Sequence, residues 1–327
     1  MKSWRSSLIN LSLLFAAACL GSYQSRAQAA ADVPEQKSAL GDECCDVDRA
    51  DDVWLISTRA LGCPSWDNTI EIELHVEHYV GKGGGWIETS LDEFLASSNP
   101  AQPTMIYVPG NQIDWNEAIK RGWHVRNSVL GCSQIEPIRF VIWTWPSDRI
   151  HGLLRDVRVK AARTDGEAYY LAWLLSQLDS STPLSILGYS LGARVTTGAL
   201  HLLGGGELAG RTLPHAQAPP VRVALLAAGV HNNWLQPGAY QEYALSQMDR
   251  LLIQYNSRDP VLQRYRCLER HARPAALGYT GMYVDESLGA WIEQQDVRCI
   301  VGKSHAEARY FNSTTLTDQI RDALFGD

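Results

Sequence analysis

Hydrophobic residues fall along the chain in short uninterrupted runs, separated by stretches with helical spacing. The runs predict buried strands at residues 53–58, 105–108, 140–144, 184–187, 221–227, 251–256 and 297–301. Helices are expected from Asp114 to Gly122, from Thr164 or Asp165 to Leu178, from Ala193 to Leu203, and from Leu316 to Phe325 with Thr315 as its cap. Apolar strands that alternate with helices are typical of a mostly parallel sheet with helices on both faces, so the pattern predicts an α/β fold.

One segment has a different pattern, because apolar and polar residues alternate over residues 69–80. A period of two predicts a half-buried strand, antiparallel and near an edge of the sheet. His75 and His78 would then point to opposite faces, so they are not expected to share a metal ion. The glycine-rich residues 81–85 lack the G-K-S/T ending of a phosphate loop and are expected to form a turn.

The first 29 residues have the pattern of a secretory signal peptide. Lys2 and Arg5 precede an apolar run of 13 residues, 8–20, and a small-residue cleavage site follows at 27–29. This run is shorter than the roughly 20 residues that a membrane span needs, and no later segment is long and apolar enough. The sequence therefore predicts export to the periplasm, the cell envelope or the medium, without a transmembrane segment after the signal peptide. Lipoprotein cleavage before Cys19 is the alternative, although the usual leucine three residues earlier is missing.

Removal of the signal peptide leaves 327 − 29 = 298 residues, a length typical of one large α/β domain with insertions. We expect this domain over residues 53–327, after a polar extension at 30–52. Segments 204–220 and 229–250 are possible caps over a site. The net charge becomes (29 − 3) − 36 = −10, which argues against nucleic acid as a partner because phosphate contacts need a basic face.

Six cysteines remain after this cleavage, and an even number in an exported chain predicts disulfide bonds. They are Cys44, Cys45, Cys63, Cys132, Cys267 and Cys299. Their pairing stays open, because six cysteines can be connected in many ways. The sequence contains no C-x-x-C pattern, and nothing in it implies a metal or a cofactor.

The most informative motif is Gly188-Tyr189-Ser190-Leu191-Gly192, which has the form G-x-S-x-G. An apolar strand precedes it and a helical segment follows it, which is the context of a nucleophilic serine on a sharp strand-to-helix turn. Small residues are needed there because a side chain would collide with neighbouring backbone. The free N–H groups at the start of the helix can stabilise a developing oxyanion. The alternative is an ordinary glycine-rich turn.

A serine nucleophile needs a base and an acid, which in this architecture follow in the order serine, acid, histidine. Asp259 lies just beyond the predicted strand 251–256, so its carboxylate is expected to lie level with Ser190. His305 follows the last predicted strand by four residues and is the expected base. His271 competes with it, but no strand separates His271 from Asp259. A turn aspartate and a solvated loop histidine are the alternative roles of Asp259 and His305.

An oxyanion hole requires two N–H donors. Leu191 supplies one as the residue after the nucleophile, and the second is expected from the loop after strand 105–108, where Asn111 is the candidate by position. His231 precedes the acid and is expected in a pocket or on the surface. Three tryptophans could line an apolar acyl site: Trp115, Trp145 and Trp234.

These residues resemble the α/β-hydrolase superfamily of serine esterases and lipases, and most closely a bacterial group of unknown function. The resemblance covers roughly residues 104–311. It is carried by Val108-Pro109-Gly110-Asn111, Trp143-Thr144-Trp145-Pro146-Ser147, the segment Gly188 to Ala193, Asp259 and His305. It implies the α/β-hydrolase fold and acyl hydrolysis through a serine acyl-enzyme. Pro109 stands where the family usually has a histidine that helps to brace the oxyanion loop.

The leading hypothesis is an exported serine hydrolase that cleaves a small-molecule or lipid-like carboxylic ester through Ser190. One alternative is a non-catalytic binding protein of the cell envelope on a hydrolase scaffold, because a fold does not determine a function. Another is an acyltransferase or peptidase that uses the same three residues on a different acceptor or substrate.

Overall fold

The computed structural model describes residues 49–62, 72–131, 133–213, 218–268, 273–284 and 291–326. All of these residues belong to one of the two units into which the chain divides. The predicted signal peptide and most of the predicted extension lie outside the described residues, as do Cys44, Cys45, Cys63 and Cys132.

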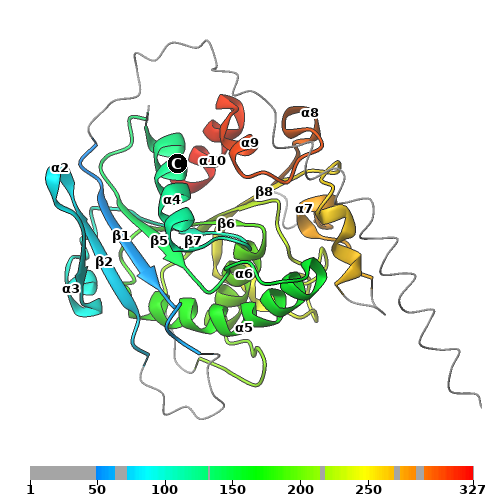
Figure 1. Cartoon of the computed structure of the whole chain (residues 1–327), viewed down its shortest axis with the longest axis horizontal. Helices are drawn as coiled ribbons and strands as arrows, with labels where there is room; N and C mark the ends of the chain where they lie inside the picture. Colours follow the sequence, from blue (N-terminus) through cyan, green and yellow to red (C-terminus); the bar gives the residue numbers. More distant parts are fainter. Residues whose placement is uncertain are drawn as a thin grey trace, which may run out of the picture. The chain divides into compact units, whose positions relative to one another are not determined.

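A nine-stranded sheet with the order β3-β2-β1-β5-β4-β6-β7-β8-β9 forms the centre of the described residues (Figure 1). Its strands are β1 (Asp52–Ser57), β2 (His75–Val80), β3 (Gly85–Thr89), β4 (Thr104–Val108), β5 (Arg139–Thr144), β6 (Leu184–Tyr189), β7 (Val221–Leu226), β8 (Met248–Tyr255) and β9 (Ile292–Asp296). In this sheet order, every neighbouring pair from β1 to β9 is parallel, whereas β2 is antiparallel to both β1 and β3. The carboxyl ends of the parallel strands therefore meet at one edge.

Four long helices cover the sheet: α4 (Trp115–Leu130), α5 (Leu153–Gln177), α6 (Leu191–Leu203) and α10 (Thr314–Phe325). Alternate residues of the central strands pack into two separate cores, because successive side chains point to opposite faces. Ile106 and Val108 share a core with α5 and α6, whereas Met105 and Tyr107 share one with α4 and α10. Figure 1 shows these helix pairs on opposite sides of the sheet. The predicted fold class, α/β with a mostly parallel central sheet and helices on both faces, is confirmed.

The shorter helices lie in the connections and at the sheet edge. They are α2 (Gly81–Gly84), α3 (Leu91–Ala96), α7 (Leu277–Thr280), α8 (Arg298–Val301), α9 (Ala308–Phe311) and the 3₁₀ helices η2 (Glu242–Gln247) and η3 (Leu262–Cys267). The turn expected at residues 81–85 is the short helix α2, which leads into the edge strand β3. The antiparallel strand expected over residues 69–80 is β2, confirmed over His75–Val80, and the described residues 72–74 are not part of it.

Several predicted elements are wrong in their bounds. Helix α5 begins at Leu153, well before Thr164 or Asp165, and Gly152 precedes it with a φ of 91°. Its first turns are rich in charged residues, so the apolar stripe that indicates a helix starts only later. The last strand is β9, and residues 298–301 of the predicted strand are helix α8. His305 therefore follows the last strand by 305 − 296 = 9 residues rather than four.

Helix α4 confirms Asp114 as a cap, because the Asp114 carboxylate accepts a hydrogen bond from the Glu117 amide at 2.9 Å. The helix continues beyond Gly122 to Leu130. Helix α10 is capped by Ser313 rather than Thr315. Segment 229–250 packs on α6, where the Thr197 hydroxyl donates to Gln241 Oε1 at 2.6 Å. That this segment or 204–220 covers a site stays a prediction.

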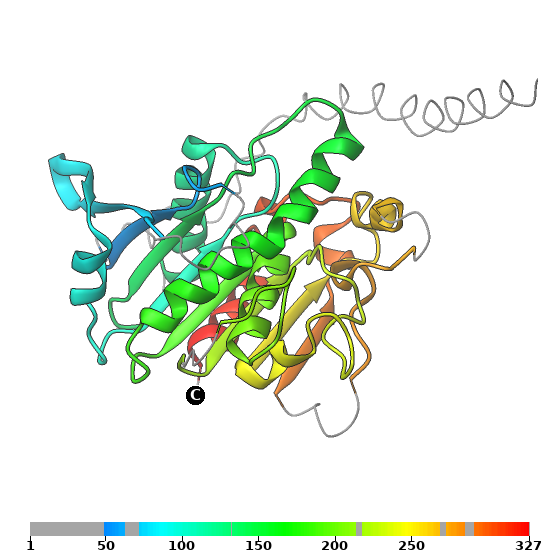
Figure 2. The same ribbon diagram turned by 90° about the horizontal axis from the view of Figure 1, so that it is seen from below.

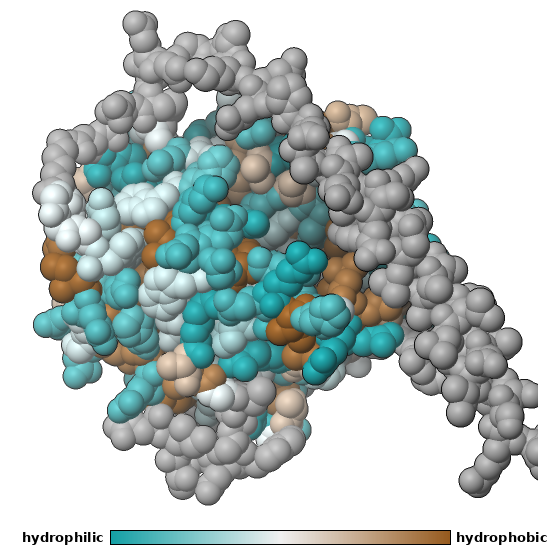
Figure 3. All heavy atoms as spheres, viewed as in Figure 1, coloured by the Kyte–Doolittle hydropathy of each residue, from teal (hydrophilic) through white to brown (hydrophobic). Residues whose placement is uncertain are grey.

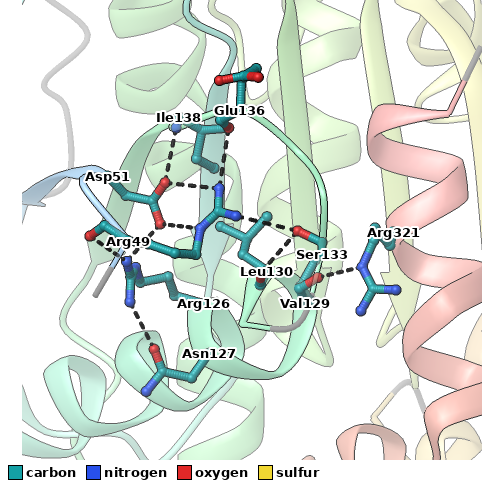
Figure 4. Close-up of polar contacts among 10 residues, drawn as sticks. All are labelled: Arg49, Asp51, Arg126, Asn127, Val129, Leu130, Ser133, Glu136, Ile138 and Arg321. Atoms are coloured by element: carbon teal, nitrogen blue, oxygen red, sulfur yellow. Dashed lines mark hydrogen bonds and ion pairs between the residues drawn. The ribbon is translucent and has the colours of Figure 1, made fainter. Parts of the chain in front are cut away.

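The start of the described chain is held by a buried carboxylate (Figure 4). Asp51 accepts hydrogen bonds from Arg49 at 3.0 and 3.1 Å and from the Ile138 amide at 3.0 Å. Arg126 on α4 also pairs with it at 2.7 Å. Two cations and a backbone donor offset the cost of burying this charge, and they hold the residues before β1 against β5 and α4.

No helix in the described part of the chain is long and apolar enough to cross a membrane. Cys267 and Cys299, the two cysteines within the described residues, are exposed and form no disulfide.

Candidate active site

Ser190 lies at a sharp turn between β6 and α6, at the carboxyl edge of the sheet. Its φ of 52° and ψ of −118° are unusual for a residue with a side chain, and such strain costs on the order of 1–3 kcal/mol. The surrounding contacts hold it there, because the Ser190 amide donates to Leu226 O at 3.0 Å and its carbonyl accepts from the Gly229 amide at 2.8 Å.

The two motif glycines are required by close backbone approach. A Cβ on Gly188 would lie 2.8 Å from Ala193 Cα, and a Cβ on Gly192 would lie 2.1 Å from Val108 O. Neither contact is possible for a real side chain, so the glycines allow α6 to pack against β6 and against the end of β4. The sequence motif therefore corresponds to the turn expected of it.

Three predicted residues from distant parts of the chain form a hydrogen-bonded series. Ser190 Oγ lies 3.0 Å from His305 Nε2, and His305 Nδ1 lies 2.6 Å from Asp259 Oδ2. A carboxylate can only accept, so Nδ1 carries the proton and Nε2 is the acceptor for the serine hydroxyl. Asp259 is fully buried, whereas the His305 side chain is 19% exposed. Access to the imidazole is thus retained while the acid is shielded from water.

Asp259 is oriented by the turn that follows β8. Its second oxygen, Oδ1, accepts hydrogen bonds from the amides of Val261 and Leu262 at 2.8 and 3.0 Å. The turn role considered for this aspartate and its contact with His305 are therefore both present, one on each oxygen. Two backbone donors fix the carboxylate plane and leave Oδ2 directed at the imidazole.

The loop that carries His305 is braced from two strands. Asn256, at the end of β8, donates from Nδ2 to Gly302 O at 2.8 Å and to Ser304 O at 3.0 Å. The Tyr189 hydroxyl, from the residue before the serine, donates to the His305 carbonyl. The backbone on both sides of the imidazole is thus tied to β8 and β6.

A second buried acid, Glu307, lies two residues beyond His305 and was not identified from the sequence. It accepts a hydrogen bond from the Tyr107 hydroxyl at 2.7 Å and pairs with Arg121 at 3.2 Å. Burial raises the pKa of Glu307, while Tyr107 and Arg121 oppose that rise. This cluster connects the histidine loop to β4 and α4. An acid near a histidine in sequence gives no signal that distinguishes such a contact.

The loop after β4 lies directly against the serine. A Cβ on Gly110 would be 2.9 Å from Ser190 Cβ. Among the described residues, the backbone N–H groups of Leu191 and Asn111 have no hydrogen-bond acceptor. The first residues of a helix lack an intrahelical partner, so the amide of Leu191 at the start of α6 is available. Both predicted oxyanion donors are therefore free to bind a ligand atom.

The W-P-S segment after β5 braces this loop, a role that was not predicted from the sequence. The fully buried Trp145 donates from Nε1 to Pro109 O at 2.9 Å. Ser147 donates from Oγ to Ile113 O at 2.8 Å and accepts from the Ile113 amide. Both ends of the loop are therefore held.

Asp156, on the first turn of α5, holds the middle of the same loop. Its Oδ2 accepts from the side-chain amides of Asn111 at 2.7 Å and Gln112 at 3.0 Å. Its Oδ1 accepts from the Ile150 amide at 2.9 Å. This contact was not predicted, because the helix was expected to begin only at Thr164 or Asp165. Asp156 was then expected to lie in a connection before the helix.

His271, the competing histidine, lies outside the described residues. His231 is buried between Trp234 and Tyr265, and burial together with Arg194 lowers its pKa to about 4.

His75 and His78 contact acids near the opposite end of the sheet order: Glu77 and Glu88 for His75, and Asp52 for His78. Trp115 packs against His75. Within the described residues, no group of three or more His, Cys, Asp or Glu side chains is arranged to hold a metal ion.

Comparisons with known proteins identify no close relative. No protein-family model and no curated protein matches the chain. Among solved structures, the chain is similar to esterase B from Lactobacillus rhamnosis, in a crystal structure described with a C4-C4 SN3 tributyrin phosphonate. That match covers 97% of this chain and 98% of the esterase, with 10% identity and a TM-score of 0.30. A likeness of this size is too weak to bear on fold or function.

Proposed function

We propose that the protein is a serine hydrolase that cleaves a carboxylic ester through an acyl-enzyme on Ser190. One observation carries this proposal: Ser190 Oγ, His305 and the buried Asp259 form a continuous hydrogen-bonded series at a strained strand-to-helix turn. A strained turn persists only where surrounding contacts enforce it, and such turns gather at functional sites.

In the proposed first step, Ser190 Oγ attacks the ester carbonyl carbon while His305 Nε2 takes the hydroxyl proton. The imidazolium that forms is stabilised by Asp259, to which Nδ1–H already donates. The carbonyl π electrons move to the oxygen, which becomes an oxyanion. The Leu191 and Asn111 amides, which have no acceptor among the described residues, are the proposed donors to it.

The tetrahedral intermediate then collapses, and the bond to the alcohol oxygen breaks. His305 gives its proton to that oxygen, so a neutral alcohol leaves and an acyl group remains on Ser190. Water repeats the attack with His305 as the base, and the carboxylic acid leaves as the serine hydroxyl regains its proton. The two steps regenerate the starting protonation states without a cofactor.

Export is a second part of the proposal. It is supported by the basic, apolar and small-residue pattern of residues 1–29. Secretion of the native chain, with its amino terminus sequenced afterwards, tests it. We expect cleavage after Ala29, and recovery of an uncleaved intracellular chain contradicts this part alone.

The test of the hydrolase is fluorophosphonate labelling of the purified protein, with Ser190→Ala as the control. A fluorophosphonate reacts only with an activated serine, so we expect one modified peptide, containing Ser190, and none in the variant. Hydrolysis of p-nitrophenyl esters of increasing chain length follows. Full ester hydrolysis by Ser190→Ala refutes the proposal, and a folded protein that is neither labelled nor active favours the non-catalytic alternative. Added alcohols or amines reveal an acyltransferase if they divert the acyl group from water.

A further inference from the structure

Three segments follow β5, β8 and β9 at the carboxyl edge of the sheet and lie around Ser190: residues 145–158, 256–268 and 297–309. Hydrogen bonds join the first two, because Arg158 donates to Cys267 O at 2.9 Å and to Leu268 O at 3.2 Å. Asp156, half a turn earlier, contacts the loop after β4. The first turns of α5 therefore extend across the edge from the loop after β4 to the segment after β8. Figure 2 shows the amino-terminal end of α5 beside that segment.

The charges of these segments are strongly unequal. Eight exposed side chains are basic: Arg149, Arg155, Arg258, Arg264, Arg266, Arg298, Lys303 and Arg309. We call this set the basic edge. Asp148 is the one exposed acid in the same three segments, and it pairs with Arg59. The other acids there, Asp156, Asp259 and Glu307, are buried.

The excess of exposed basic residues in these segments does not follow from the composition of the chain, because the whole chain has 29 basic and 36 acidic residues. A protein with excess negative charge thus concentrates positive charge around the candidate nucleophile. Two of the eight have partners: Arg298 pairs with Asp296 on β9 at 3.5 Å, and Arg264 has one as well. The segment after β4 adds the exposed Asp114 and Lys120, which balance each other.

Large aliphatic side chains are exposed among these cations. Leu153 and Leu154 on the first turn of α5 are 37% and 41% exposed, and Val261 and Ile300 are 42% and 46% exposed. Isolated exposed aliphatics are ordinary, but these four share the three segments with the basic edge. Figure 3 shows hydrophobic residues interspersed among hydrophilic ones on the face drawn there.

We propose that the basic edge and these four aliphatic residues dock the protein on an anionic lipid surface, with Ser190 facing that surface. Charge complementarity identifies the occupant, since basic residues at an anionic leaflet are attracted to its headgroups and aliphatic side chains enter the boundary below them. The cations are spread over three segments rather than converging on one point, which suits an extended surface better than a single small anion. The proposal rests on the proposed function, because it names the physical form of the ester: a lipid presented in such a surface.

The test is sedimentation with vesicles, using Ser190→Ala protein produced without residues 1–29, so that neither turnover nor a lipid anchor at Cys19 contributes. We expect binding to vesicles of equal phosphatidylcholine and phosphatidylglycerol, and little binding to phosphatidylcholine alone. Raising the salt from about 0.1 M to about 1 M, which shortens the Debye length from about 10 Å to about 3 Å, should release the protein.

Matched variants locate the surface. Arg155→Gln/Arg266→Gln removes two charges of the basic edge, and the partition coefficient should fall about 30-fold, at about 1 kcal/mol for each basic residue near an anionic surface. Lys120→Gln/Arg250→Gln removes two charges outside the three segments and should change it little. Leu154→Ser should weaken binding, whereas Ile87→Ser, at a side chain 52% exposed on the edge strand β3, should not.

The proposal is overturned by equal binding to both vesicle types, or by an equal loss of vesicle binding in the two double variants. Displacement from vesicles by millimolar inorganic phosphate also overturns it, because it identifies a small-anion site instead. Binding that requires removal of residues 30–48 also overturns it, because the acidic amino-terminal segment is then the native occupant. None of these results depends on turnover. In protein with Ser190 intact, hydrolysis of a soluble ester should be unchanged by Arg155→Gln/Arg266→Gln, so a failure of docking and a failure of the hydrolase are separate outcomes.

Discussion

Replacing Trp145 by phenylalanine tests whether the W-P-S segment positions the oxyanion loop. Trp145 is fully buried, and its Nε1–H is bonded to the Pro109 carbonyl at 2.9 Å. Phenylalanine fills most of the same space but donates no hydrogen bond, so a buried carbonyl loses its partner. That loss costs about 1–3 kcal/mol, and the free energy of unfolding measured in urea should fall by this amount.

The effect on activity follows from what the carbonyl holds. Pro109 is two residues from Asn111, the proposed second oxyanion donor, and loss of one such donor costs about 10²–10³-fold in kcat. Asp156 still holds the Asn111 side chain, so the donor is displaced rather than lost. We expect kcat for a soluble ester to fall about 10–100-fold and KM to change little, since the interaction strengthens only in the transition state.

Trp143 supplies the matched control. It is buried as completely as Trp145, and its Nε1 has no hydrogen-bond partner among the described residues. Trp143→Phe therefore makes the same change of ring without removing a hydrogen bond, and it should retain most of its kcat. Equal kcat in the two variants, or wild-type kcat in Trp145→Phe, refutes the role given to this tryptophan.

Three further predictions address the site and its surroundings. Asp259→Asn should lower kcat about 10⁴-fold in steady-state assays while the protein stays folded, since the amide favours the wrong imidazole tautomer; a loss below about 10-fold contradicts this role. Gly110→Ala would place a Cβ 2.9 Å from Ser190 Cβ and should lower kcat about 10²-fold, whereas Gly62→Ala, with no atom within 4 Å, should not; equal activity argues against a tightly packed loop. His231, whose pKa of about 4 lies below the ordinary 6.5, stays neutral when folded but binds a proton when unfolded, so about 3 kcal/mol of stability should be lost as the pH falls from about 6.5 to 4. The His231→Phe protein should lack this loss in urea titrations, and an identical pH dependence counts against it.

The elements that the sequence predicted well are those with a local signal. Strands β4 to β8 are apolar runs, and each begins within three residues of its predicted first residue. The glycines around Ser190 indicated the turn because only close backbone packing requires them. Asp259 could be placed because it follows β8, and the carboxyl ends of parallel strands meet at one edge. His305 was placed from a strand expected at 297–301, and it lies at the same edge because β9, nine residues before it, is also parallel.

The parts that were missed depend on contacts that are distant in sequence. Helix α5 begins in a charged stretch, where Asp156 is buried by its bonds to the loop after β4 rather than by an apolar stripe. Strand β9 has the polar sequence of residues 292–296, so the apolar residues 297–301 were mistaken for it. Glu307 becomes buried only through Tyr107 and Arg121, which lie about 200 residues earlier in the chain. No local sequence pattern indicates contacts between residues so far apart in the chain.

The loop at Pro109 is supported by contacts from two other segments of the chain. The proline side chain has no polar atom, so it cannot brace the loop by a hydrogen bond. Proline instead fixes its own φ near −65° and presents a carbonyl, and that carbonyl is held by Trp145. Asp156 holds Asn111 and Gln112 through their side-chain amides, so neither brace uses the Asn111 backbone N–H. The support of this loop therefore comes from Trp145, just beyond β5, and from Asp156 on α5, and it leaves the proposed donor free.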